Sequence, residues 1–459
     1  MNFYFGTHVK RVFDAGELNN SRGAQVRAHE NDGDVTRSAQ EPDTLSRART
    51  HARTPRSDAR TPRSDARRSV RRSADPPGAA ARRVPSAVAA PAAKMARLPL
   101  LTAGLSLRIR ALGYWSLVYG YCALCAGAAL LKLWWSFVIR PSATFQRAAR
   151  ETPPGCLSDT SLGTHCYVRI KESGLRFHYV AAGERGKPLM LLLHGFPEFW
   201  FSWRHQLREF KSEFRVVAVD MRGYGESDLP LSTESYRLDY LVTDVKDIVE
   251  YLGYSRCFLV GHDWGGTIAW LFAIHYPEMV VKLIVLNSPH PSVLADYALR
   301  HPSQLLKSSH FFFFQLPRFP ELMLSINDFK ALKSLFTSRN TGVSRKGRWL
   351  TTEELEAYLY AFSQPGALTG ALSHYRTVFS FLPLSQNDVR SPVLLLWGER
   401  DAFLEQDMAE ACRIYIRNHF RLNIISGASH WLQQDQPDIV NTLIWTFLKE
   451  GEGRKAYRN

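Results

Sequence analysis

The chain has 459 residues, 45% hydrophobic and 22% charged, which is enough apolar material for one large domain with appendages or for two or three smaller ones. Six cysteines are too few for a disulfide-built scaffold, and the one Cys-x-x-Cys pair lacks the second pair that a structural zinc site needs. The net charge of +15 belongs to the N-terminal third, since residues 151–459 contain 33 basic and 33 acidic side chains, so nucleic acid is not an expected partner.

Residues 1–94 lack the pattern of a folded domain. From about Ser21 onward they are rich in Arg, Ala, Ser, Asp and Pro, contain few aromatic residues and show no apolar periodicity. The heptapeptide RTPRSDA occurs twice in tandem, at 53–59 and 60–66, but each copy is too polar to bury a face against its neighbour. We therefore predict that 1–94 is a disordered basic extension, and Met95 opens a stretch that would also suit a protein start.

An uncharged apolar segment of 21 residues follows, at 111–131. As a helix it would be about 30 Å long, which is the thickness of the hydrocarbon core of a bilayer. It exceeds the length of about 7–15 residues that is usual for the apolar part of a cleaved signal sequence. Basic and tryptophan side chains flank it, as at membrane interfaces: Arg108, Arg110, Lys132, Trp134, Trp135 and Arg140.

We therefore predict that 111–131 is a retained transmembrane anchor of a single-pass signal-anchor protein, with the endoplasmic reticulum as the expected membrane. A buried core helix is the alternative. Basic residues are balanced on the two sides of the segment, so the positive-inside rule leaves the side occupied by the following domain open.

From about residue 155 to 450, short apolar runs alternate with segments of helical length, such as 240–253 and 265–277. Continuous apolar strands that alternate with helices predict one α/β domain with a mostly parallel, doubly wound sheet covered on both faces. Residues from about 289 to 391 have no such runs and a helical pattern, so we expect a helical lid inserted there. Six runs are typical of buried strands: 189–194, 215–220, 257–262, 282–287, 393–397 and 421–425.

The segment VGHDWGG, residues 260–266, has the pattern of a nucleophile elbow, in which a strand turns sharply into a helix between glycines. Serine is the usual central residue, whereas here it is Asp263. A carboxylate needs no deprotonation at neutral pH and can attack a saturated carbon to form an ester. A helix-capping aspartate would explain the residue type but not the glycines and the preceding strand, so we predict that Asp263 is a nucleophile.

Two later residues complete the order that this architecture requires, which is nucleophile, acid and then histidine. Asp401 directly follows the run VLLLWGER, and His430 lies in the segment SGASHW after the last run. A histidine near its ordinary pKa can take a proton from water and direct hydroxide at the ester carbonyl of Asp263. We expect His430 to be this base and Asp401 the acid that orients it.

The segment His194-Gly195-Phe196-Pro197 ends the first apolar run. Because it is the first such loop upstream of the elbow, we expect the backbone N–H of Phe196 to form an oxyanion hole with that of Trp264, the residue after the nucleophile. The bond before Pro197 is a candidate for a cis peptide. A tight turn without a catalytic role is the alternative.

Five segments together resemble the epoxide hydrolases of the α/β-hydrolase fold, most of all their membrane-anchored vertebrate members. The resemblance covers about residues 95–450 and implies a lid between strands 6 and 7. It assigns Asp263 as nucleophile, His430 as proton acceptor, Asp401 as its orienting acid, and Tyr375 in the lid as proton donor to the opening ring. The segments are HGFPEFWFSWRHQL (194–207), DMRGYGESD (220–228), GHDWGG (261–266), WGERDAF (397–403) and SHWLQQDQP (429–437).

The resemblance implies hydrolysis of epoxides to vicinal diols through an aspartyl ester. A small lipophilic epoxide, such as an epoxidised fatty acid, and water are the expected reactants, and the anchor would contact membrane lipid. We expect no metal and no organic cofactor, because the sequence has neither a phosphate-binding glycine loop nor a cluster of metal ligands.

The sequence departs from the family pattern in one place. A second lid tyrosine is usual in a segment that corresponds here to HFFFFQ, residues 310–315, which has none. On this alignment Tyr375 acts alone or His310 substitutes for the missing tyrosine, and turnover could be weak. The phenylalanines are lid core or a substrate wall, with His310, Phe311 and Phe314 as candidate substrate contacts.

Two other functions stay open. A haloalkane or haloacid dehalogenase would use the same Asp-Asp-His set, and Trp264 suits halide binding, but Phe196 stands where many haloalkane dehalogenases have asparagine, and a halide needs no tyrosine donor. A membrane-tethered binding protein with little catalysis is favoured only by the missing second tyrosine. Diol formation, halide release or the absence of turnover distinguishes the three functions.

Overall fold

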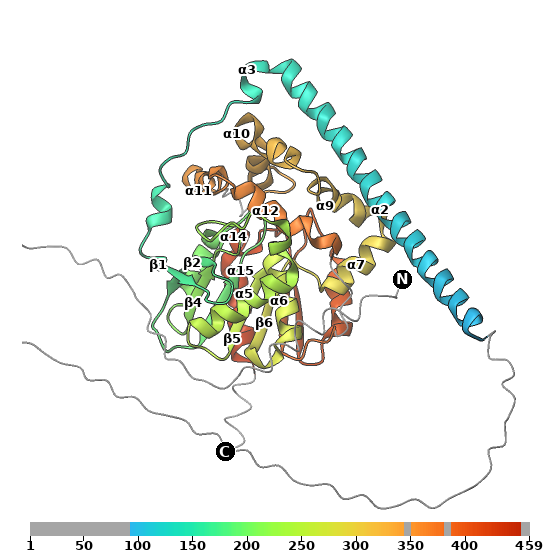
Figure 1. Cartoon of the computed structure of the whole chain (residues 1–459). Helices are drawn as coiled ribbons and strands as arrows, with labels where there is room; N and C mark the ends of the chain where they lie inside the picture. The colour runs from blue at the N-terminus through green and yellow to red at the C-terminus, as the bar shows by residue number, and fades with distance from the viewer. Residues whose placement is uncertain (1–91, 344–349, 381–386, 451–459) are drawn as a thin grey trace, which may run out of the picture. The chain divides into compact units, whose positions relative to one another are not determined.

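The computed structural model describes residues 92–343, 350–380 and 387–450 (Figure 1). The predicted disordered extension 1–94 therefore lies outside the described residues except for its last three, which begin helix α2 (Ala92–Ile139). All six cysteines lie within the described residues, and each is a free thiol.

Eight strands form one sheet in the order β1-β2-β4-β3-β5-β6-β7-β8. β2 pairs antiparallel with β1 and β4, and every other pairing of neighbours is parallel. The strands are β1 (Thr164–Arg169), β2 (Arg176–Ala182), β3 (Leu189–Leu193), β4 (Arg215–Val219), β5 (Cys257–His262), β6 (Val280–Leu286), β7 (Val393–Gly398) and β8 (Phe420–Ile425).

The six apolar runs in the sequence correspond to β3 through β8, which confirms the predicted parallel core of the sheet. β1 and β2 were not predicted from the sequence. β1 is an edge strand with mostly exposed side chains, and β2 contains the buried His178, so neither strand is a continuous apolar run.

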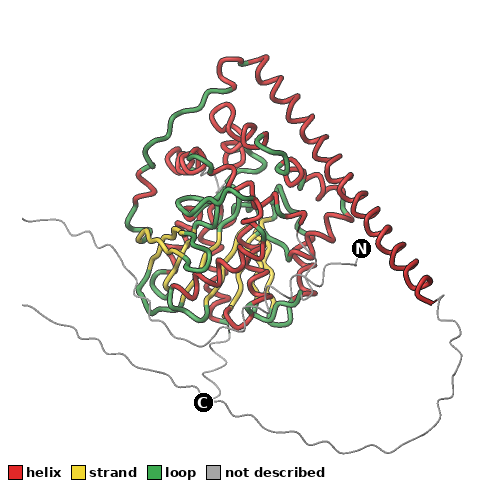
Figure 2. Tube along the Cα trace, viewed as in Figure 1, coloured by secondary structure: helices red, strands yellow, loops and turns green. Residues whose placement is uncertain are grey.

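Helices cover both faces of the sheet, as Figure 2 shows. Alternate residues of β3 enter two separate buried clusters: Leu191 packs with residues of α5 (Leu238–Tyr251) and α6 (Trp264–His275), and Leu192 with residues of α4 (Arg204–Phe210) and α15 (Pro437–Lys449). Because side chains of a strand alternate between the faces, this division is the expected consequence of a doubly wound sheet. Short helices α3 (Pro141–Thr144), α13 (Asp407–Ala411) and α14 (Leu432–Asp435) complete the domain.

A helical insertion separates β6 from β7, at the position where the sequence predicts a helical lid. Its side chains pack against Phe196 and Trp264, which follow β3 and β5, so the insertion covers the carboxyl edge of the parallel strands (Figure 1). In its described part it consists of α7 (Pro291–Arg300), α8 (Pro302–Lys307), α9 (Ser309–Phe313), α10 (Phe319–Thr337), α11 (Thr352–Ser363) and α12 (Ala367–Arg376).

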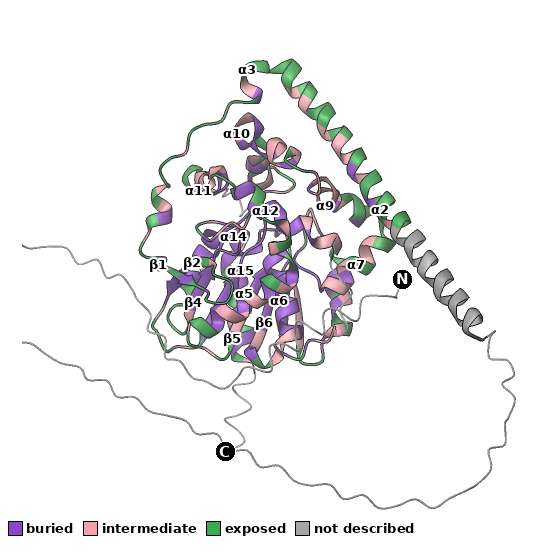
Figure 3. Cartoon of the chain, in the orientation of Figure 1, coloured by how far each residue is buried: buried purple, intermediate pink, exposed green. Residues whose placement is uncertain are grey.

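Helix α2 contains the segment 111–131 that was predicted to be an anchor. Its part Leu112–Ile139 is long and apolar enough to cross a membrane. Large apolar side chains on this part are exposed, such as those of Leu117 and Leu124 (Figure 3). A helix that is apolar and exposed in this way is suited to a lipid environment.

Candidate active site

Asp263 occupies the turn between β5 and α6, with φ of 52° and ψ of −117°. A positive φ is unfavourable for a residue other than glycine, and such strain is typical of a nucleophile elbow. The neighbouring glycines permit close backbone contacts. A Cβ atom at Gly265 would lie 2.2 Å from the carbonyl oxygen of Leu193, and one at Gly261 would lie 2.4 Å from that of Gly265. The elbow can therefore form only with glycine at both positions.

The loop after β3 lies against the elbow. The N–H of Phe196 donates a hydrogen bond to Oδ1 of Asp263 at 2.9 Å. Trp264 is the first residue of α6, so its N–H has no acceptor within the helix. A Cβ atom at Gly195 would lie 2.4 Å from Cβ of Asp263, which shows how closely the two loops approach. The Phe196–Pro197 bond is cis, as predicted.

His430 lies in the loop after β8 and connects the two acids. Its Nδ1–H donates to Oδ2 of Asp401 at 2.7 Å, and its Nε2 is 3.6 Å from Oδ2 of Asp263. The other oxygen of Asp401 accepts the N–H groups of Phe403 and Leu404, at 2.8 and 3.0 Å. Asp401 is thus held from one side and orients the imidazole with its remaining oxygen.

The charged forms of His430, Asp401 and Asp263 stabilise one another. Burial alone would lower the pKa of His430, but the attraction of Asp401 and Asp263 outweighs burial and raises this pKa above its ordinary value. Burial would raise the pKa of Asp263, but His430 and the Phe196 N–H outweigh it and lower this pKa. Asp263 is therefore a carboxylate at neutral pH.

The three side chains differ in exposure. Asp263 is 21% exposed, whereas His430 and Asp401 are 3% and 1% exposed. Asp263 is therefore the member of this group that a small molecule can reach directly.

Tyr375, on α12, packs edge-on against the rings of Phe196 and Trp264, with centroid distances of 5.3 and 5.0 Å. Burial, followed by the nearby charge of Asp263, raises the pKa of Tyr375 well above its ordinary value. The phenol consequently keeps its proton at neutral pH and can donate a hydrogen bond. The insertion thus places the phenol ring of Tyr375 beside the loop after β3 and the elbow.

Helix α9 contributes an aromatic wall to the same region. Phe311 stacks on Trp264 with a centroid distance of 6.0 Å, and Phe314 packs against Phe196 at 5.6 Å. Both rings also contact Tyr375 edge-on. The phenylalanine run of the sequence therefore surrounds the predicted site with apolar surface, on the side of the insertion.

His310 lies next to this wall, with its ring 5.7 Å from that of Tyr375. Its Nδ1 is 3.0 Å from the carbonyl oxygen of Lys307, which can only accept, and burial lowers the pKa of His310 to about 4. A neutral ring that donates from Nδ1 presents only an acceptor at Nε2. In this state Nε2 of His310 cannot donate a hydrogen bond as the hydroxyl of a second lid tyrosine would.

A buried hydrogen-bond network that the sequence did not predict lies behind Asp263. Glu198 accepts hydrogen bonds from Nδ1 of His262 at 2.6 Å and from the N–H of Gly195 at 3.1 Å. Nε2 of His262 in turn donates to the carbonyl oxygen of His430 at 2.8 Å. The network ties the loop after β3, the elbow and the loop of the histidine together. Glu198 lies in the segment 194–207 and His262 in the segment 261–266, but neither segment alone indicates that the two side chains are in contact.

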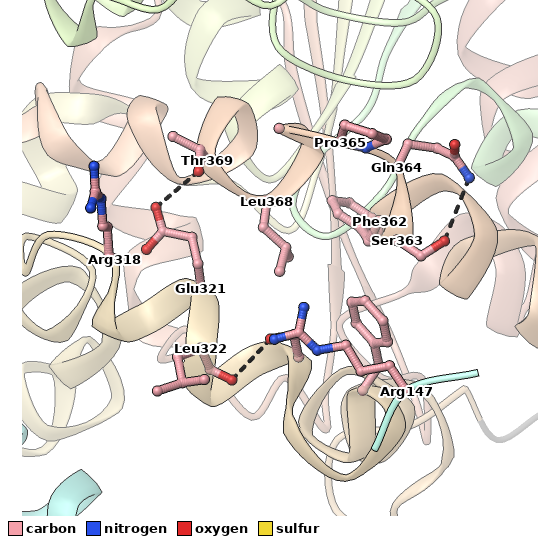
Figure 4. Close-up of a pocket in the computed structure, with 13 residues that line it drawn as sticks. Arg147, Arg318, Glu321, Leu322, Phe362, Ser363, Gln364, Pro365, Leu368 and Thr369 are labelled. Carbon is pink, nitrogen blue, oxygen red and sulfur yellow. Dashed lines mark hydrogen bonds between the residues drawn. The ribbon is translucent and has the colours of Figure 1, made fainter. Parts of the chain in front are cut away.

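A cavity of about 370 Å³ lies within the insertion, between α10 and α12 (Figure 4). Phe362 lines it and also packs against Phe196, with a centroid distance of 6.1 Å, so one side chain joins the cavity to the surroundings of Asp263. Arg147 and Arg318 line the cavity as well. Its one acidic side chain, Glu321, is paired with Arg376 at 2.8 Å, so the lining has an excess of positive charge.

The eight-stranded sheet and the elbow define an α/β hydrolase, and residues 188–437 match the α/β hydrolase fold family. The chain belongs to the epoxide hydrolases of this fold. It is 71% identical over 342 residues to epoxide hydrolase 4 of Mus musculus, covering 74% of this chain and 95% of that protein. It is 48% identical to epoxide hydrolase 3 of Xenopus tropicalis, covering 78% and 97%.

Solved structures agree with this assignment. The crystal structure of an epoxide hydrolase of Bacillus megaterium in complex with an inhibitor matches with a TM-score of 0.57 and 34% sequence identity, over 62% of this chain and 100% of that one. An epoxide hydrolase from Vigna radiata matches with a TM-score of 0.53 and 26% identity, over 62% and 98%. The family and fold expected from the sequence motifs are thus confirmed.

Proposed function

We propose that the protein hydrolyses epoxides to vicinal diols through an ester on Asp263. The observation that carries this proposal is the contact of His430 with Asp401 at 2.7 Å and with Asp263 at 3.6 Å, beside the protonated hydroxyl of Tyr375. This set contains a nucleophile, a base with its orienting acid, and a proton donor.

In the first step Oδ2 of Asp263 attacks a ring carbon of the epoxide. Oδ1 already accepts the Phe196 N–H, which leaves Oδ2 as the free oxygen. The carbon–oxygen bond of the ring breaks as the new ester bond forms, and Tyr375 donates its proton to the departing oxygen. The product is a hydroxyalkyl ester of Asp263.

Ester formation removes one of the two negative charges that face His430. The pKa of His430 then falls and the imidazolium loses a proton. This proton compensates for the one that Tyr375 donated to the departing oxygen. Neutral His430 can take a proton from water, whose oxygen attacks Cγ of Asp263. The N–H groups of Phe196 and Trp264 stabilise the oxyanion at Oδ1, and its collapse releases the diol and restores the carboxylate.

We further infer that the substrates are lipophilic, such as epoxidised fatty acids, which would place the enzyme in lipid metabolism. Phe311 and Phe314 offer an apolar wall, and the cavity beside Phe362 contains Arg147 and Arg318, which suit a carboxylate at the far end of the substrate. Membrane lipid would surround α2, as a single-pass signal-anchor in the endoplasmic reticulum, near the store of such substrates.

A single turnover with enzyme in excess of an epoxide, in isotopically heavy-oxygen water, tests the ester. We expect the first diol to contain light oxygen, because one of its oxygens comes from Asp263, and Asp263→Ala to form no diol. Heavy oxygen in the first diol would contradict the ester. Halide release from haloalkanes without diol formation would favour a dehalogenase, and no turnover with a folded chain would favour a binding protein.

A further inference from the structure

Three side chains outside the active site converge at the antiparallel edge of the sheet. They are His165 on β1, His178 on β2 and Glu226 in the loop after β4, and their potential ligand atoms all lie within 4.8 Å of one another. The register pairs Tyr167 with His178, so His165, two residues earlier, lies diagonally across on the same face. His178 is fully buried, whereas His165 and Glu226 are exposed to solvent.

Hydrogen bonds fix the proton on each imidazole. Nε2 of His165 is 3.0 Å from the carbonyl oxygen of Leu157, and Nδ1 of His178 is 2.8 Å from Oδ2 of Asp220. A carbonyl and a carboxylate can only accept, so both of these nitrogens are donors. Asp220 also accepts the N–H groups of Trp200 and Glu226, as a carboxylate does.

The other two nitrogens face each other. Nδ1 of His165 and Nε2 of His178 are 2.9 Å apart, and with both rings neutral each presents a lone pair. Two lone pairs at this distance repel, so a positive charge must lie between them, either an additional proton or a metal ion.

We propose that His165, His178 and Glu226 bind a divalent transition metal ion, for which zinc is best suited. Two imidazole nitrogens, a carboxylate oxygen and a water complete the tetrahedral set that zinc prefers. Zinc–nitrogen bonds of about 2.0–2.1 Å place tetrahedral ligands about 3.3 Å apart, so the two imidazoles need to separate by only a few tenths of an ångström.

The surroundings of these ligands are those of a metal site. Asp220 holds His178 from behind, which is the carboxylate–histidine–metal arrangement that fixes ring orientation. Tyr167 donates its hydroxyl proton to Oε2 of Glu226 and orients the third ligand. Because His165 and Glu226 are exposed, the ion has a path from solvent.

The position of the site suggests a structural role. Asp220 also accepts the N–H groups of Trp200, at 2.8 Å, and of Glu226, at 3.1 Å. A metal on His178 would therefore brace the segment at Trp200, which follows the loop after β3, and the loop after β4 through one carboxylate. The role is independent of the proposed ester chemistry, since none of the three ligands belongs to the group around Asp263.

The test is a zinc titration of the full chain, purified in detergent and stripped with a chelator, against a chromophoric competitor. We expect one tight site in the wild type and a loss of affinity of about 10–100-fold or more in His165→Ala and Glu226→Gln. Both residues are exposed, so these variants should fold. His419→Ala, which removes an exposed histidine paired with Glu450, is the matched control and should retain the affinity.

Two further measurements complete the test. X-ray absorption should show two nitrogen ligands and at least one oxygen ligand at bond lengths typical of zinc, and zinc should raise the Tm of the wild type but not of His165→Ala. Absence of tight binding, or an affinity that His165→Ala leaves unchanged, would overturn the proposal. A nitrogen NMR signature of a doubly protonated His178 in the presence of zinc would also overturn the proposal. A proton, and not a metal ion, would then lie between Nδ1 of His165 and Nε2 of His178.

Discussion

The Nε2 atom of His430 lies 3.6 Å from Oδ2 of Asp263, longer than a hydrogen bond but close enough for strong attraction between an imidazolium and a carboxylate. The charge of His430 therefore depends on the chemical state of Asp263. While Asp263 is a free carboxylate, it favours the protonated imidazole. Once Asp263 is an ester, this attraction is lost, and His430 can become the base that the second step needs.

Replacing the base should trap the ester. In His430→Gln, Asp263 can still attack the epoxide, but no group activates water. We expect the peptide that contains Asp263 to gain the mass of the epoxide and to retain it, as seen by mass spectrometry of the digested protein. His419→Gln, at an exposed histidine paired with Glu450, should turn over normally. Multiple turnover by His430→Gln at the wild-type rate would show that another group is the base.

The two steps should respond differently to pH. Because the pKa of Asp263 is lowered, its attack on the epoxide should change little between about pH 6 and 8. Ester hydrolysis requires neutral His430, so its rate should rise with pH through the pKa of His430 in the intermediate. Rapid-quench measurement of ester formation and decay separates the two profiles. Parallel profiles for both steps would contradict the assigned roles.

Asp401→Asn should slow ester hydrolysis far more than ester formation. The amide removes the negative charge that raises the pKa of His430. It also removes the carboxylate that accepts the hydrogen bond from Nδ1 of His430, with 2.7 Å between Nδ1 and Oδ2. The remaining hydrolysis should reach its plateau at lower pH, because the pKa of His430 falls with the loss of Asp401. The same rapid-quench experiment provides the measurement. If both steps slow by the same factor, Asp401 does not act through His430.

Tyr375→Phe should slow ring opening by about a hundredfold or more, because it removes the proton donor and leaves the ring in place. Ester hydrolysis should be nearly unchanged once the ester has formed. Tyr360→Phe, on the neighbouring helix α11, is the matched control for the loss of a phenol hydroxyl. A Tyr375→Phe enzyme with normal ester formation would assign the proton donor to another group.

Gly195→Ala should abolish ester formation. The added Cβ atom would lie 2.4 Å from Cβ of Asp263, so Asp263 or the loop after β3 must move. The circular dichroism spectrum and Tm of the variant show whether the fold is retained. Gly120→Ala in α2, where an added Cβ atom meets nothing within 4 Å, should remain active. Normal activity of Gly195→Ala would mean that the close approach is unimportant for the reaction.

The cavity in the insertion predicts a preference for acidic substrates. Arg318→Ala should raise KM several-fold for an epoxidised fatty acid and leave KM for its methyl ester unchanged, because only the free acid has a carboxylate to pair with Arg318. Arg300→Ala, at an exposed arginine of α7, is the control for the loss of a surface charge. An equal change for acid and ester would contradict a carboxylate site in this cavity.

The strands β3 to β8, the elbow at Asp263 and the order of Asp401 and His430 could be predicted from the sequence alone. These features depend on local patterns, since a buried parallel strand needs a continuous apolar run and a tight turn needs glycine at fixed positions. β1 and β2 escaped notice because exposure on one side and the buried His178 interrupt their apolar pattern.

Which polar groups come into contact is visible only in the folded chain. Glu198 and His262 are 64 residues apart, and their contact depends on the parallel pairing of β3 with β5. The facing nitrogens of His165 and His178 depend in the same way on the register of β1 and β2. The proton positions on His310 follow from the acceptor nearby, which no spacing reveals. Local sequence specifies local conformation, whereas such contacts arise when register and packing bring distant loops together.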